Sequence, residues 1–185
     1  MGDYRFDFGP SLFTMPHFVD ELFTLAGENP RDHFQYKRKE IGCKYYWEDG
    51  IRLNAYGDTD RFLVEVDDKL GVPKHQLQDY LSRAEKKYNR TVSIFLEQSL
   101  HKLDTYLNKA TVKGILHLFS YELETTLHKV NTRRLKEPHL VQFYDRFATY
   151  NGSNPYQTPG MMTLIQHLEQ YLSLIHISEP TRRYE

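Results

Sequence analysis

Histidine, cysteine and serine are the residues of this sequence from which a metal site or a nucleophile would first be built. Nine histidines and a single cysteine, Cys43, are scattered along the 185 residues. No histidine pair has metalloprotease spacing around a glutamate, and no histidine-cysteine cluster supplies the ligands of a zinc site. No G-x-S-x-G turn presents a serine nucleophile. We therefore interpret the histidines as ordinary surface or core residues and predict no metal site.

Composition and glycine spacing restrict cofactors and partners. The ten glycines are dispersed and none forms G-x-G-x-x-G, the turn that holds the pyrophosphate of a dinucleotide. The chain by itself is therefore predicted to lack a dinucleotide phosphate cradle. A formal net charge of -1 argues against broad nucleic-acid binding, which depends on phosphate neutralisation by Lys and Arg. No apolar run reaches the ~20 residues of a transmembrane helix.

The first part of the chain is predicted to be rich in strands. Tyr4, Phe6 and Phe8 alternate with polar residues, which is typical of a short strand ending at Gly9-Pro10. Residues 34–41 predict another strand. Asp49-Gly50 predicts a two-residue hairpin turn between residues 44–47 and 51–56, with positive φ at both turn residues. The hairpin carries Tyr45, Tyr46, Trp47 and Tyr56, as a platform against a core or a ligand would.

Helical spacing of apolar residues predicts the other elements. A first helix runs from Pro16 to Gly27 with one apolar face, and from Asp58 onward the helical period dominates. The predicted faces are Val19, Leu22, Phe23 and Leu25; Phe62, Leu63, Val66 and Leu70, ending at Gly71; Leu77, Leu81, Ala84 and Tyr88, after Pro73; and Ile115, Leu116, Phe119, Leu123, Leu127 and Val130. Two more helices begin at Pro138 (Leu140, Phe143, Tyr144, Phe147) and Pro159 (Met162, Ile165, Leu168), with a loop at residues 151–155 between them. The chain is thus predicted to be an α+β fragment.

A basic run lies near one predicted helix end. Lys129, Arg133, Arg134 and Lys136 are interpreted as cations that complement the helix dipole. Contact with lipid headgroups is the alternative, because basic residues near an anionic surface add about 1 kcal/mol each.

The stretch Leu172–Arg182, LSLIHISEPTR, resembles the in-frame translation of a sequencing-library adapter. Segments of this kind are excluded before the fold is considered. We therefore expect residues 172–185 not to be native and the chain to be a fragment of a longer gene. The alternative is a genuine short apolar helix over Leu172–Ile177, closed by Pro180.

Two blocks of sequence carry a resemblance to a known family. FDFGPSLFTMP, Phe6–Pro16, followed by VDELF, Val19–Phe23, resembles the signature after the FAD-binding unit of bacterial carotenoid desaturases of the phytoene desaturase family. Glu137–Glu169 resembles the family's region in which an acidic-x-His/Arg-Leu helix leads to an aromatic residue, a Gly-Ser/Gly-Asn-Pro-aromatic loop and a helix ending Leu-Ile-x-x-Leu-Glu. The resemblance extends over Tyr4–Gln170. FDFGPS alone would be weak, because other amine-oxidase-like flavoproteins use similar turns.

The resemblance implies an oxidoreductase that uses FAD to introduce double bonds into phytoene or a related C40 carotenoid. It assigns residues 1–57 to part of a substrate domain and 58–171 to a helical, membrane-associated subdomain. Gly9, Pro10 and Ser11 match the loop near the flavin. The parent is expected to be cytoplasmic and peripheral on the inner face of the membrane, without nucleic acid or metal.

An apolar polyene requires a long apolar tunnel. The suitable lining residues, if they are not ordinary packing residues, are Phe13, Met15, Tyr150, Tyr156, Met161 and Met162. Acid-base residues of some relatives correspond to Ala110–Lys113, where this chain has no acid, so the catalytic residues are left unknown. The fragment alone is expected to bind no FAD and to be inactive. The alternative is a stand-alone helical binding or membrane-surface module without catalysis.

Overall fold

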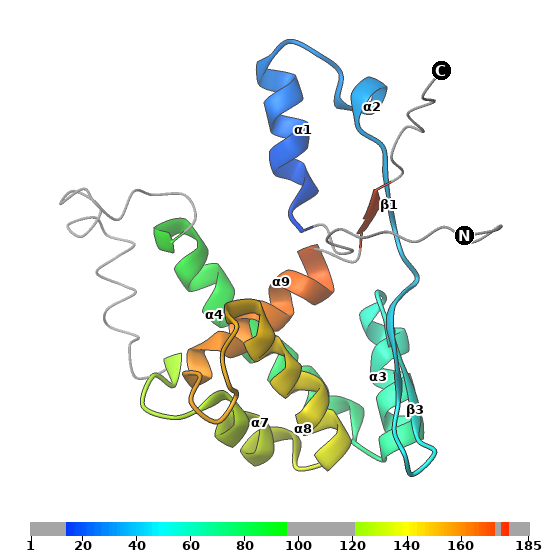
Figure 1. Ribbon diagram of the computed structural model, residues 1–185, viewed down its shortest axis with the longest axis vertical. Helices are drawn as coiled ribbons and strands as arrows, with labels where there is room; N and C mark the ends of the chain where they lie inside the picture. The colour runs from blue at the N-terminus through cyan, green and yellow to red at the C-terminus, as the bar shows by residue number, and fades with distance from the viewer. Residues whose placement is uncertain (1–13, 96–120, 173–174, 178–185) are drawn as a thin grey trace.

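The computed structural model describes residues 14–95, 121–172 and 175–177 (Figure 1). Their elements, in chain order, are α1 (Pro16–Leu25), α2 (Pro30–His33), β1 (Tyr36–Arg38), β2 (Ile41–Tyr46), β3 (Arg52–Tyr56), α3 (Thr59–Leu70), α4 (Lys74–Phe95), α7 (Leu127–Leu135), α8 (Pro138–Asp145), the 3₁₀ helices η2 (Arg146–Asn151) and η3 (Gly160–Thr163), α9 (Leu164–Leu172) and β4 (Ile175–Ile177). The predicted α+β character is confirmed. Strands lie mainly in the first part of the chain, and helices pack behind the hairpin.

The β2–β3 hairpin forms as predicted, but the prediction of its turn is wrong. The backbone N–H of Trp47 donates to the carbonyl of Ile51 at 3.0 Å, and that of Gly50 donates to the carbonyl of Trp47 at 3.1 Å. These bonds enclose three loop residues rather than two. Of these three loop residues, only Gly50 has positive φ, at 90°. A type I turn followed by one left-handed residue closes such a loop, so Asp49 keeps ordinary backbone angles.

The helix that begins at Pro16 is confirmed, but its predicted apolar face is largely exposed. No residue of α1 is buried, and Leu22 and Leu25 are 66% and 77% exposed. In Figure 1 α1 lies apart from the helical body that contains α7 and α8. A hydrophobic face without a covering partner contributes little burial energy.

The strand predicted over residues 34–41 is wrong in its extent, because this stretch has two different partners. β1 pairs antiparallel with β4, and β2 pairs with β3. Lys39 and Glu40 separate the two strands. Before them, Pro30 starts the short helix α2, which the sequence did not predict, and the Asn29 side chain caps this helix. The helix proposed as an alternative for Leu172–Ile177 is also wrong, since Ile175–Ile177 is extended.

The main core lies where the hairpin meets α3, α4 and α8. Of the side chains predicted for the faces of α3 and α4, Phe62, Val66 and Leu77 are completely buried there, whereas Leu70 is only partly buried against this core. Asp58 caps α3 through a hydrogen bond from the Arg61 backbone. Gly71 ends the helix with φ of 66°, a conformation that costs glycine little. The predicted start and stop of α3 are confirmed.

The predicted helical pattern fails at Leu123. Residues 121–126 form a turn instead, Leu123 is exposed, and α7 begins only at Leu127. The Thr126 side chain accepts a hydrogen bond from the Lys129 backbone and caps α7. Glu122 has φ of 55°, which a continuous helix does not allow. The predicted Tyr4, Phe6, Phe8, Ile115, Leu116 and Phe119 lie outside the described residues.

The last helices follow the prediction closely. Pro138 is the first residue of α8, and the Glu137 side chain accepts a hydrogen bond from the Leu140 backbone at 2.6 Å. Pro159 precedes η3, so the predicted helix begins with a 3₁₀ turn and continues as α9. No described helix contains a stretch that is both long and apolar enough to cross a membrane.

Candidate functional site

The aromatic hairpin faces the protein interior at Tyr45 and Trp47. The Tyr45 ring stacks on Trp47 with centroids 5.7 Å apart and contacts Phe143 of α8 at 4.7 Å. The Trp47 indole N–H donates to the side-chain oxygen of Gln142 at 2.6 Å. The sequence alone did not decide whether this aromatic platform packs against a core or binds a ligand. These two side chains pack on α8, whereas Tyr46 is exposed.

A buried polar cluster adjoins this aromatic core. Glu169 of α9 is buried and accepts hydrogen bonds from the Arg146 guanidinium and, at 2.5 Å, from the Tyr150 hydroxyl. The hydroxyl of Tyr45 is also buried and has no hydrogen-bond partner among the described residues. One cation, one carboxylate and two phenols therefore meet at the junction of the hairpin, η2 and α9.

The electrostatics of this cluster keep both phenols protonated. Burial raises the pKa of Tyr45 well above its ordinary value, and the nearby Arg146 charge opposes this only in part. Burial, followed by the hydrogen bond to Glu169, raises the pKa of Tyr150. Burial is the largest influence on Arg146 and tends to lower its pKa, but the charge and hydrogen bond of Glu169, together with Tyr45 and Tyr150, raise the pKa overall. The tyrosines can donate hydrogen bonds here, but they do not act as bases near neutral pH.

The predicted substrate-binding residues are divided between two regions. Tyr150 lies in η2, where its ring stacks on Phe147 at 6.2 Å, and Met161 and Met162 lie in the adjoining η3. Tyr156 lies in the loop between these elements and packs beside His128 with ring centroids 4.3 Å apart. Met15 instead precedes α1, which makes its main contacts with α2.

Of these residues, Met162 is packed against the main core, while Tyr150 is 43% exposed and Tyr156 is 62% exposed. Neither of the two pockets described below is lined by any of the predicted substrate-binding residues. Their role as a tunnel lining stays a prediction. Phe13 and the flavin-loop residues Gly9, Pro10 and Ser11 lie outside the described residues.

A second polar network stabilises the helical part. The Tyr80 hydroxyl donates to the side-chain oxygen of Asn131 at 2.7 Å, and the Asn131 amide donates to Asp145 at 2.8 Å. The other Asp145 oxygen lies 2.6 Å from Nδ1 of His128. Burial raises the pKa of Tyr80 well above its usual range. These hydrogen bonds connect α4, α7 and α8, and networks whose polar groups are all satisfied rigidify a core.

Two small pockets are lined by several charged side chains, and of their cations the sequence had pointed only to Arg134, as part of the basic run. One lies at the hairpin tip, beside Trp47, Asp49 and His139. The other lies between α4 and α7, around Glu122. Spacing along α4 indicates part of the second pocket, but Glu122 approaches from a turn distant in sequence, which no local pattern predicts. Within the described part of the chain, no group of three or more His, Cys, Asp or Glu side chains could hold a metal ion.

Comparison with known proteins identifies the class of protein to which the chain is similar. The chain is 44% identical over 169 residues to a 1-hydroxycarotenoid 3,4-desaturase of Flavobacterium sp. (strain P99-3), covering 91% of this chain and 34% of that protein. It is 29% identical over 176 residues to a 4,4'-diapolycopene oxygenase of Methylomonas sp, covering 94% of this chain and 35% of that protein. It is 22% identical over 173 residues to a carotenoid 3,4-desaturase of Haloarcula japonica, covering 94% and 34%. No protein-family model matches.

These relatives are oxidoreductases that act on carotenoids, as their names state. The chain corresponds to a segment of the carotenoid desaturase family, and the resemblance found in its sequence is confirmed. The chain spans about a third of the length of these curated relatives.

Proposed function

We propose that this chain forms part of an FAD-dependent desaturase that introduces double bonds into phytoene or a related C40 carotenoid. The observation that carries the proposal is the 44% identity to a 1-hydroxycarotenoid 3,4-desaturase over 91% of the chain. Hydroxylated carotenoids are therefore the first substrates to test, with phytoene beside them. A stand-alone helical binding or membrane-surface module is less well supported, because all three relatives described above are enzymes by name.

The roles of individual segments extend this proposal. Residues 1–57 would belong to the substrate domain and 58–171 to the helical subdomain, with 172–185 not native. Phe13, Met15, Tyr150, Tyr156, Met161 and Met162 would contact the polyene. The protein would lie on the inner membrane face, where an apolar substrate is dissolved.

Each new double bond requires the removal of two hydrogens and therefore a two-electron acceptor, and FAD is the cofactor that we propose for this role. Gly9, Pro10 and Ser11 are the residues proposed to approach the flavin. They lie outside the described residues, so no described side chain is assigned to the cofactor. Because the sequence contains no G-x-G-x-x-G, the purified 185-residue chain is expected to carry no stoichiometric flavin absorbance and no activity.

The test is to express the full-length protein that contains this sequence in bacteria accumulating either phytoene or a 1-hydroxycarotenoid. Pigments are separated by chromatography, and each desaturation should lower the mass by two hydrogens and shift absorption to longer wavelength. Gly9→Val should reduce bound flavin and product together, whereas Gly2→Val, the same change outside the matched motif, should leave both unchanged. A flavin-free protein that converts neither carotenoid would overturn the proposal.

A further inference from the structure

A single carboxylate between α4 and α7 is surrounded by several cations. Glu122 pairs with Lys87, with Arg133 at 2.6 Å and with Arg134 at 2.8 Å. The side chains of Glu122 and Lys87 are only 11% and 8% exposed. One negative charge cannot neutralise three positive charges, so the cluster retains an excess of positive charge in a partly desolvated place.

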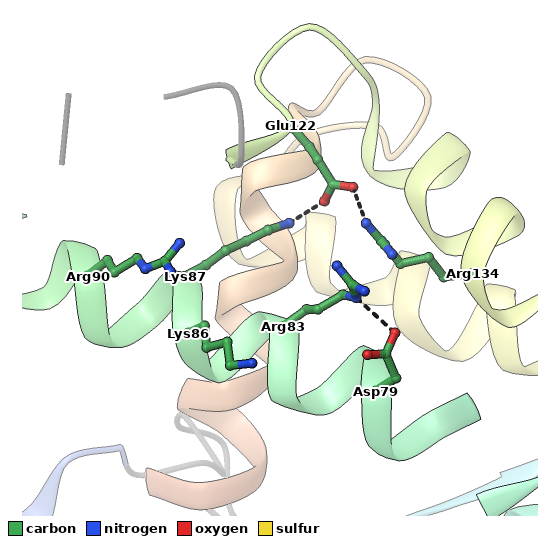
Figure 2. A pocket seen from close by; sticks show the side chains of 7 residues that line it. All are labelled: Asp79, Arg83, Lys86, Lys87, Arg90, Glu122 and Arg134. Atoms are coloured by element: carbon green, nitrogen blue, oxygen red, sulfur yellow. Dashed lines mark hydrogen bonds and ion pairs between the residues drawn. The ribbon is translucent and has the colours of Figure 1, made fainter. Parts of the chain in front are cut away.

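Glu122, Lys87 and Arg134 border a cavity of about 230 Å³ (Figure 2). Five of its lining residues come from α4, at positions that recur every three or four residues and so share one helix face. The lining consists of Asp79, Arg83, Lys86, Lys87, Arg90, Glu122 and Arg134. Five cations and two carboxylates give a net of three positive charges around the cavity.

Arg83, Lys87 and Arg134 are oriented by ion pairs, whereas no ion pair of Lys86 is found among the described residues. Arg83 is held by Asp79 at 2.8 Å, one turn earlier on α4. Lys86 is exposed and makes no direct ion pair with a described residue. The paired cations contribute a fixed positive field, and the Lys86 ammonium can donate hydrogen bonds to an incoming anion.

The position of Glu122 is maintained by its backbone. Its φ of 55° lies in the left-handed region, where a non-glycine residue is strained. Its carbonyl oxygen would lie 2.9 Å from a Cβ atom added at Gly160, so the loop depends on a glycine there. Burial lowers the pKa of Lys87 against the opposing effect of Glu122. Burial would raise the pKa of Glu122, but the bonds from Lys87 and Arg134 hold it below its usual value.

We propose that this cavity binds a phosphate-class oxyanion. An oxyanion accepts hydrogen bonds from several donors at once, and guanidinium groups match its geometry with two parallel bonds. The cavity is smaller than the roughly 300–1,000 Å³ of typical small-molecule sites, which favours one phosphoryl group over a nucleotide. The group belongs either to a soluble phosphate compound or to a lipid headgroup. The proposal is independent of the carotenoid chemistry.

The binding test uses the purified 185-residue chain and inorganic phosphate, titrated by calorimetry at constant ionic strength. Saturable binding is expected. Lys86→Glu should weaken it by about 10-fold or more, as loss of a hydrogen bond to a charged group does. Arg83→Gln is a second variant, expected to weaken binding in the same direction. Lys74→Glu makes the same change as Lys86→Glu on the same helix but outside the cavity, and should leave affinity unchanged.

Vesicles distinguish the two sources of the phosphoryl group. Phosphatidylcholine vesicles with and without phosphatidic acid are sedimented with each variant. Binding that requires phosphatidic acid, is lost in Lys86→Glu and is displaced by free phosphate assigns the site to a lipid headgroup. Saturable binding of free phosphate without vesicle binding assigns it to a soluble compound. Binding of neither, or equal weakening by Lys74→Glu, overturns the proposal.

Discussion

Glu122 and Glu169 are two glutamates whose side chains are largely shielded from solvent, but their surroundings differ. The Glu169 carboxylate accepts hydrogen bonds from the Arg146 guanidinium and the Tyr150 hydroxyl beside the aromatic core. Glu122 pairs with three cations, Lys87, Arg133 and Arg134, at the border of a cavity. A shielded carboxylate can thus complete a core or organise an anion site, and what borders it distinguishes the two.

The largest expected effect is that of Glu122→Gln. The change leaves the buried Lys87 ammonium without its carboxylate, and removing one partner of a buried pair costs about 3–5 kcal/mol. Glu169→Gln should cost clearly less, because Arg146 is partly exposed and the amide oxygen can still accept from Tyr150. Both free energies of unfolding are measured by urea denaturation.

The double variant Lys87→Met/Glu122→Gln is the control. It removes the stranded charge and should recover part of the stability lost in Glu122→Gln. If Glu169→Gln is as destabilising as Glu122→Gln, the contrast that we draw between the two glutamates is wrong.

Gly160→Ala tests whether packing holds the Glu122 turn in place. The added Cβ atom would lie 2.6 Å from Cγ2 of Val130 and 2.9 Å from the Glu122 carbonyl oxygen. Neither atom is the end of a flexible side chain, so we expect a loss of about 1–3 kcal/mol in thermal unfolding experiments. Val130→Ala in the same chain relieves one of the two contacts. The two changes should therefore be less than additive, and strict additivity would show that the close approach is unimportant.

Gln166→Met tests the interior close to Glu169 on α9. Gln166 is 1% exposed, and neither of its amide atoms has a hydrogen-bond partner among the described residues. An apolar side chain of similar length removes the unsatisfied groups and should stabilise the fold by about 1 kcal/mol. Gln142→Met is the matched control with the opposite sign, because the Gln142 side-chain oxygen accepts from Trp47. Destabilisation by Gln166→Met would mean that the amide is satisfied after all.

Local pattern predicted much of the fold. The α3 helix is the clearest case, since Asp58, the apolar face and Gly71 all act within a few turns of one another and all behave as expected. The turn at Glu122 shows the limit. A glutamate with positive φ has no sequence signature, and the contact of its backbone with the Gly160 region arises only from tertiary packing.

The site residues divide in the same way. The aromatic content of the hairpin identified Tyr45 and Trp47 as important, but spacing could not decide between a core and a ligand. Contact of Tyr150 with a polyene stays a prediction, and its hydrogen bond to Glu169, 19 residues later, had no sequence signature. The Lys87–Glu122 pair joins α4 to the turn that precedes α7, 35 positions later. The periodicity of apolar residues cannot predict pairs that are this far apart in the sequence.

His139 inverts the arrangement at Glu122, because one ionisable base lies between two carboxylates. Its Nδ1 is 2.8 Å from Glu137 and its Nε2 is 2.8 Å from Asp49. The hydrogen bond to Glu137, followed by the charges of both acids, raises the pKa of His139. Because the folded pKa is raised, the stabilisation is complete below the ordinary value near ~6.5 and is lost as pH rises through the folded value. Pairs this close to solvent contribute at most about 1 kcal/mol.

Trp47, the single tryptophan of the chain, reports this titration directly. Its ring packs edge-on against His139 with centroids 4.9 Å apart, so protonation of the imidazole should change its fluorescence. We expect a fluorescence titration with a midpoint above ~6.5, absent in His139→Gln and retained in the matched variant His33→Gln. The hairpin tip should then be held more tightly in acid than in base, whereas the Glu122 turn should weaken in acid because its lowered pKa means that protonation removes its ion pairs. A Trp47 titration that persists in His139→Gln would show that another group senses pH at the tip.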